Sequence, residues 1–161
     1  MEKVISIGKQ NFASLRENHY FFVDKSHFIK DWWENGDEIT LITRPRRFGK
    51  TLNMSMLDCF FSNKYAVRGD LFEGLGVWKE EKYRELQGKY PVIFLSFAAV
   101  KADQLSEAKI QIKQQIARVY EENRYLLDGD LLSGNEKKAY NEVNLHMGDA
   151  EAAAALNNMS M

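Results

Sequence analysis

The chain has 161 residues, a formal net charge of −1, 45% hydrophobic and 28% charged residues. This length fits one domain with a sizeable core, and the balanced charge argues against a general binder of nucleic acid or membrane surfaces. The sequence has neither a signal-peptide core nor a membrane span, so we expect a cytoplasmic protein. Cys59 is the only cysteine, which excludes a disulfide within the chain, and we expect it to be a small buried hydrophobic residue.

The N-terminal part predicts a short strand followed by a helix. Tyr20–Val23 is apolar and fits a strand, and Asp24 or Ser26 can cap the helix that follows it. The helix is expected to end at Gly36, and its broad apolar face is formed by Phe28, Ile29, Trp32 and Trp33. We expect these aromatic residues to lie in the core or in a seam between secondary-structure elements.

Two further strands and several helices are predicted along the rest of the chain. Residues 39–43 fit a strand, and 91–97 fit a strand buried on both faces of a parallel sheet, because their apolar run is nearly continuous. Helices are expected over 52–61, 79–86, 104–127, 136–145 and 151–156. This pattern predicts an α/β fold with a mostly parallel sheet. The sheet would be incomplete in this chain, since so few strands are visible.

The segment between strand 39–43 and helix 52–61 carries most of a phosphate-binding motif. Gly49, Lys50 and Thr51 match the end of G-x-x-x-x-G-K-[ST], in the strand–loop–helix context that the motif requires. Backbone N–H groups at the helix start would face a phosphate, Lys50 would reach the β- and γ-phosphates, and Thr51 would bind Mg²⁺. Arg44 stands where the motif has its first glycine, and Pro45 favours an extended Arg44.

The same loop is strongly basic. Seven residues without an acid contain Arg44, Arg46, Arg47 and Lys50. Such a charge density suits a nucleoside triphosphate, although a basic turn that contacts nucleic-acid phosphates or an acidic partner would have the same composition.

A carboxylate for hydrolysis is not evident. Phosphate-loop enzymes place an acid at the end of a neighbouring strand to orient Mg²⁺ and water, but strand 91–97 offers only Ser96 there. Asp24 follows Tyr20–Val23 and is equally well explained as a helix cap. We therefore assign no catalytic residue and expect this chain to be the N-terminal part of a longer protein.

The loop Thr43–Leu52 resembles the signature of the bacterial AAA-ATPase-like family, whose phosphate loop reads R-P-R-R-F-G-K-[ST] with arginine in place of the first glycine. Ile7-Gly8 with Phe12, and Tyr20 to Ser26, are similar to the family's I-G-x-x-x-F and Y-x-V-D-K-[ST] segments. Residues 71–75 and 91–97 also resemble family landmarks.

This resemblance implies a P-loop NTPase core with three layers, divided here into an N-terminal segment (1–37), the phosphate-loop unit (38–62) and a second strand with helices (63–161). It implies ATP and Mg²⁺ as cofactors, with Thr51 on the metal. The loop residues that would bind nucleotide are Arg46, Arg47, Phe48, Gly49, Lys50, Thr51 and Leu52, and Phe12 is a weaker candidate for the base pocket.

The family's metal-orienting acidic strand would follow the end of this sequence, as would the nuclease-like C-terminal domain that longer members resemble. The leading hypothesis is thus a nucleotide-binding part of an ATPase. The alternatives are a non-enzymatic module that binds nucleic acid or an acidic protein, and an inactive gene fragment that self-associates through an uncovered sheet edge.

Overall fold

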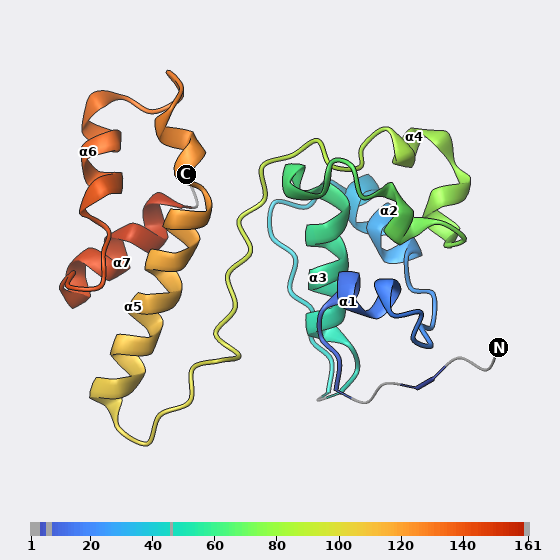
Figure 1. The fold of residues 1–161 in the computed structure, drawn as a ribbon, viewed down its shortest axis with the longest axis horizontal. Helices are drawn as coiled ribbons and strands as arrows, with labels where there is room; N and C mark the ends of the chain where they lie inside the picture. Colours follow the sequence, from blue (N-terminus) through green and yellow to red (C-terminus); the bar gives the residue numbers. More distant parts are fainter. Residues whose placement is uncertain (1–3, 6–7, 46, 160–161) are drawn as a thin grey trace. The chain divides into compact units, whose positions relative to one another are not determined.

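The structure, a computed structural model, describes residues 4–5, 8–45 and 47–159. The chain divides into two compact units, unit 1 within Met1–Val92 and unit 2 within Ile93–Met161, and each is described by itself. Every regular element in the described ranges is an α-helix or a 3₁₀ helix (Figure 1).

The described residues of unit 1 form four α-helices and three 3₁₀ helices: α1 (Phe12–Glu17), α2 (His27–Asn35), α3 (Lys50–Phe61), η1 (Asn63–Tyr65), η2 (Gly69–Phe72), η3 (Gly76–Lys79) and α4 (Glu81–Arg84). The helices α2 and α3 and the short α4 were predicted, and α2 ends at Gly36 in the left-handed conformation expected of a helix-ending glycine. The helix α1 was not predicted. It begins where the Asn11 side chain accepts a hydrogen bond from the Ser14 N–H at 2.8 Å.

The core of unit 1 is built around one face of α3. Met56, Cys59 and Phe60 are fully buried, and Phe61 is 4% exposed. The Phe60 ring meets the Phe72 ring edge-on at 5.0 Å, and Phe72 in turn stacks on Phe12 at 5.1 Å. Burial of such rings is the main stabilising contribution in a unit of this size, because each removes a large apolar area from water.

The two tryptophans of α2 pack against Phe61, the last residue of α3. The rings of Trp32 and Trp33 each lie 5.4 Å from the Phe61 ring. This confirms the prediction that they serve packing between helices.

Unit 2 is formed by α5 (Leu105–Glu122), η4 (Arg124–Leu127), α6 (Gly134–Glu142) and α7 (Asp149–Asn158). Its smaller core joins α5 to α7 through Ile116, Tyr120, Met147, Ala152 and Ala155. The Tyr120 hydroxyl donates to the Ala155 carbonyl at 2.9 Å, and Ser133 and Glu136 form the capping box that begins α6. The prediction of helices in these three stretches is confirmed.

The prediction of an α/β fold with three layers and a mostly parallel sheet is wrong, because the described residues contain no strand. Tyr20–Val23 and residues 39–43 and 91–97 are non-helical stretches of chain, but a stretch of this kind becomes a strand only when a neighbour completes the hydrogen-bond ladder. Ile39 and Leu41 are 88% and 81% exposed, the reverse of a buried central strand. An apolar, β-branched composition was therefore mistaken for sheet.

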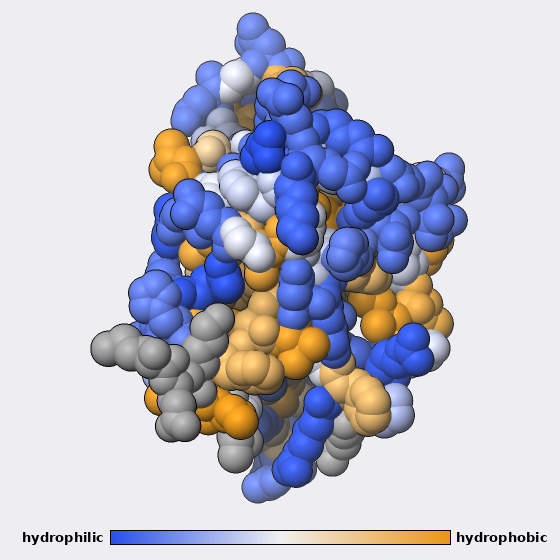
Figure 2. Space-filling view, turned by 90° about the vertical axis from the view of Figure 1, so that its right-hand side faces the viewer, coloured by the Kyte–Doolittle hydropathy of each residue, from blue (hydrophilic) through white to orange (hydrophobic). Residues whose placement is uncertain are grey.

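The surface in Figure 2 is mainly hydrophilic, with hydrophobic residues in smaller areas between the polar ones. Among the described residues, no helix combines the length and the apolar character that crossing a membrane requires.

The turn at Gly88 packs against the C-terminal end of α3 in unit 1. The Gly88 N–H donates to the Phe60 carbonyl at 2.8 Å, and an isolated parallel bridge joins Ser62 to Tyr90. Gly88 has a φ of +70°, and a Cβ at this position would lie 2.3 Å from the Ala66 Cα. A side chain is excluded here both by conformation and by space.

The segment that precedes α2 is bound to the first residues of η3 through two side chains. Asp24 accepts hydrogen bonds from the Gly76 N–H at 2.7 Å and from the Ser26 N–H at 2.8 Å. The fully buried Ser26 hydroxyl accepts one from the Val77 N–H at 3.1 Å. Partial burial alone would raise the pKa of Asp24, but these hydrogen bonds and the nearby His27 together lower it below 3.8.

Replacement of Gly88 should cost more stability than replacement of Gly74. Gly74 has a similar φ of +79°, but open space surrounds its Cβ position. We expect Gly74→Ala to lower the free energy of unfolding by about 1 kcal/mol through backbone strain, and Gly88→Ala by a further ~1–3 kcal/mol through overlap with Ala66. Urea unfolding followed by tryptophan fluorescence measures this, since all three tryptophans lie in unit 1. Equal losses would contradict the close contact.

Asp24→Asn should remove a pH-dependent part of the stability. At pH 7 we expect a loss of about 1–2 kcal/mol, because an amide cannot accept both backbone hydrogen bonds as the carboxylate does. A lowered folded-state pKa stabilises above pH 3.8, and this contribution is lost as the pH falls through the folded value, so the difference from wild type should shrink by pH 3. Urea titrations at pH 7, 5 and 3 test this, with Asp31→Asn on the exposed surface of α2 as control. A difference that stays constant over this range would refute it.

Candidate functional site

The predicted phosphate loop leads directly into the N-terminus of α3. Gly49 is the residue before the helix and has a left-handed conformation, with φ +79° and ψ 19°, and its carbonyl accepts the first helical hydrogen bond from the Asn53 N–H at 2.9 Å. Arg47 also has a positive φ, of +67°. Left-handed residues at a helix start turn successive backbone N–H groups toward one side, an arrangement that attracts anions.

Lys50, the first residue of α3, folds its side chain back across the loop. Its ammonium donates a hydrogen bond to the Arg44 carbonyl at 2.5 Å. Residues 44 and 50 are the two ends of the basic segment, so this bond joins its two ends. A phosphate oxygen is a stronger acceptor than a neutral carbonyl, so the Lys50 ammonium can exchange the Arg44 carbonyl for a phosphate.

The other predicted loop residues fall into two groups. Arg47 and Phe48 are exposed, with Phe48 59% accessible, whereas Thr51 and Leu52 are half-buried and the Leu52 side chain packs against the unit 1 core. Any contact of Leu52 with a ligand would therefore come from its backbone. Arg46 lies outside the described residues, as does Ile7 of the upstream segment.

Upstream Phe12 supports the loop indirectly. Its ring is fully buried between Phe22 and Phe72, and its N–H donates to the Ser55 hydroxyl of α3 at 3.0 Å. The ring is thus part of the core and has no free face for a base. Phe12 instead fixes the first turns of α3.

Lys25 lies at the loop although the sequence motif did not identify it. Its Nζ is 3.8 Å from the position that a Cβ of Gly49 would occupy. The signal that could have found it is the segment from Tyr20 to Ser26, where a lysine follows the acid. The structure brings this segment and the loop together, although they are far apart in the sequence.

Candidate metal ligands are few. Thr51 offers a hydroxyl at the start of α3, and among the described residues no group of three or more His, Cys, Asp or Glu side chains is placed to hold a metal ion. Both carboxylate oxygens of Asp24 accept backbone hydrogen bonds, which accounts for this residue structurally. Mg²⁺ is commonly held by few protein ligands together with phosphate oxygens and water, so a single hydroxyl fits a metal that arrives with a nucleotide.

Cys59 has no part in this site. The side chain is fully buried in the last turn of α3, and burial raises the pKa of its thiol to about 11. This confirms the prediction of a small buried hydrophobic residue.

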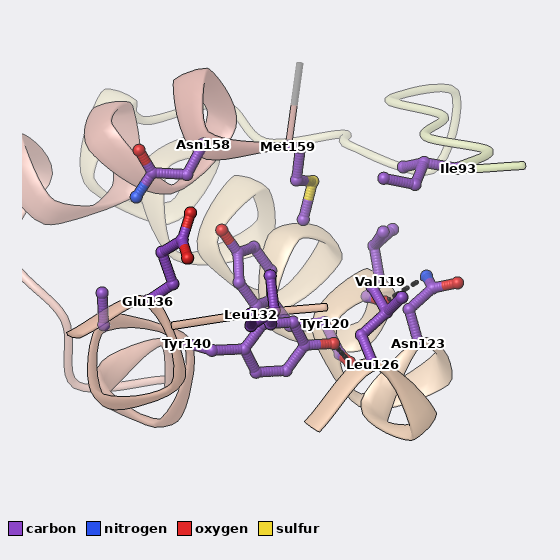
Figure 3. Close-up of a pocket in the computed structure, with 11 residues that line it drawn as sticks. Ile93, Val119, Tyr120, Asn123, Leu126, Leu132, Glu136, Tyr140, Asn158 and Met159 are labelled. Atoms are coloured by element: carbon purple, nitrogen blue, oxygen red, sulfur yellow. Dashed lines mark hydrogen bonds between the residues drawn. The ribbon is translucent and has the colours of Figure 1, made fainter. Parts of the chain in front are cut away.

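A separate cavity of about 250 Å³ lies in unit 2 between α5, η4, α6 and the C-terminal end of α7 (Figure 3). Two of its polar side chains are engaged with backbone: the Asn123 amide donates to the Val119 carbonyl at 2.7 Å, and the Tyr140 hydroxyl donates to the Tyr120 carbonyl. Among the described residues, no lysine or arginine lines it, and neither does any predicted site residue. The cavity is therefore unsuited to a phosphate.

Comparisons with known proteins show the family of the chain. An uncharacterized protein in the vnfD 5' region of Azotobacter chroococcum mcd 1 is 36% identical over 96 residues, which are 59% of this chain and 17% of that protein. The chain thus spans about a sixth of the length of this curated relative. No solved structure gives a significant match. The family described as predicted AAA-ATPase matches residues 6–152, nearly the whole chain, and the chain therefore belongs to the AAA-ATPase-like family.

Proposed function

We propose that this chain binds ATP with Mg²⁺ through the loop from Arg44 to Leu52. The observation that carries the proposal is the placement of Gly49, Lys50 and Thr51 at the N-terminus of a twelve-residue helix, with Gly49 in the left-handed conformation. Membership of the AAA-ATPase-like family supports the choice of nucleotide over other anions.

Each loop residue has a distinct role in this proposal. The Lys50 ammonium exchanges the Arg44 carbonyl for a phosphate oxygen, while the backbone N–H groups at the start of α3 bind the same phosphates. The Thr51 hydroxyl serves as a ligand of Mg²⁺, which neutralises phosphate charge when bound. Arg46 and Arg47 add positive charge beside the phosphates. Phe48 connects them to Gly49, and Leu52 contributes only its backbone.

The proposal concerns binding and includes no hydrolytic step. Hydrolysis requires a carboxylate that orients Mg²⁺ and water, and the described residues place no acidic cluster at the loop.

Lys50→Ala should weaken the binding of a fluorescent ATP analogue by more than about tenfold, because a charge-assisted contact with the phosphates is lost. Lys89→Ala is the matched control. Lys89 is exposed and lies next to Tyr90, at the opposite end of α3. Equal tryptophan fluorescence and unfolding midpoints would show that all proteins are folded. Unchanged affinity in Lys50→Ala would remove the assignment.

Thr51→Ala should abolish most of the gain in ATP affinity that Mg²⁺ provides, while affinity without Mg²⁺ changes less than about twofold. Thr43→Ala, on the exposed segment before the loop, should behave as wild type. Titrations with and without Mg²⁺ measure both. If the affinity is instead unchanged by Mg²⁺ and by Thr51→Ala and falls steeply as the salt concentration rises, the loop is an interaction surface for nucleic acid or an acidic protein.

A further inference from the structure

We infer that Lys25 is a second cationic residue of the nucleotide site and contacts the phosphates together with Lys50. This inference rests on the proposed ATP binding. Its starting observation is the position of the Lys25 Nζ, 3.8 Å from where a Cβ of Gly49 would lie. Gly49 directly precedes α3, so this ammonium lies at the helix end where the phosphates are expected.

The backbone of Lys25 is fixed on both sides. Asp24 binds the Gly76 and Ser26 N–H groups, and the Ser26 hydroxyl binds the Val77 N–H. The Lys25 carbonyl also accepts a hydrogen bond from the Phe28 N–H at 2.9 Å, in the first turn of α2. The side chain is exposed, but it starts from a rigid position, so little backbone order has to be gained on binding.

The charge balance around Lys25 favours an anion as its partner. The neighbouring carboxylate of Asp24 is engaged by two backbone N–H groups, and within residues 4–5, 8–45 and 47–159 no ion pair to the Lys25 ammonium is formed. The adjacent loop carries Arg44, Arg47 and Lys50 and no acid. Like charges held close together repel each other. A polyphosphate bound between them attracts each of them and offsets this repulsion.

Gly49 makes the approach possible. A residue with a longer side chain at position 49 would fill the space in front of the Lys25 ammonium, whereas glycine leaves it open. The segment before α2 and the start of α3 therefore each supply an ammonium group to the region around the loop.

The test measures ATP binding to the full chain with Lys25→Met, which keeps the length of the side chain and removes its charge. We expect the dissociation constant to rise about tenfold, and Lys25→Arg to recover most of the loss. Inorganic tripolyphosphate, used as a competitor, should lose affinity for Lys25→Met by a similar factor, because the contact is with phosphate and not with the base. Lys89→Met is the matched control and should bind as wild type.

The outcomes separate this inference from the proposed function. If wild type binds ATP, Lys50→Ala loses binding and Lys25→Met binds normally, the role of Lys25 is refuted and the ATP site stands. If Lys25→Met loses ATP affinity but tripolyphosphate competes as in wild type, Lys25 does not contact phosphate and the inference is again refuted. If wild type itself shows no saturable binding, the proposed function fails, and the inference fails with it.

Discussion

The burial of one face of α3 is the constraint on which the rest of unit 1 depends. Met56, Cys59 and Phe60 lie fully inside the core, and rings from the segments before and after the helix pack on that face. Because these contacts hold the helix along its length, its first residues, from Gly49 to Thr51, have a fixed direction. The loop can therefore remain exposed and basic while its helix stays in place.

A second set of contacts determines what faces the loop. Ser26 is buried and polar, and its hydroxyl and the Asp24 carboxylate satisfy three backbone N–H groups, at Ser26, Gly76 and Val77. Backbone donors left unpaired in such a position would be costly, so these short polar side chains are required there. Lys25, between them, is held at the loop by its neighbours.

The helices could be predicted from the sequence because their signals are local. Apolar spacing and the ending glycine at position 36 define α2, and the capping box of Ser133 and Glu136 marks the start of α6. The strands failed because pairing is not local: residues 39–43 favour extended backbone, but no described neighbour pairs with them. The helix α1 was missed because a six-residue helix has too few turns for a clear periodicity.

The candidate site was predicted in part for the same reason. Gly49, Lys50 and Thr51 follow one another in the sequence, so their position at a helix start could be expected. The closeness of Lys25 to Gly49 depends on how α2 and α3 pack through Trp32, Trp33 and Phe61, which no single-sequence pattern reports.

Residues near both ends of α2 lie close to the basic loop or to the segment that leads into it. Lys25 precedes its first turn, and near its other end the Trp32 indole N–H donates to the Thr40 hydroxyl at 3.1 Å, on the segment that leads to Arg44. An anion held by Lys25 and the start of α3 would add a link between the two helices that exists only while it is bound. Through thermodynamic linkage, the equilibrium between the packed and the locally unfolded state of both helices would then depend on the concentration of free ligand.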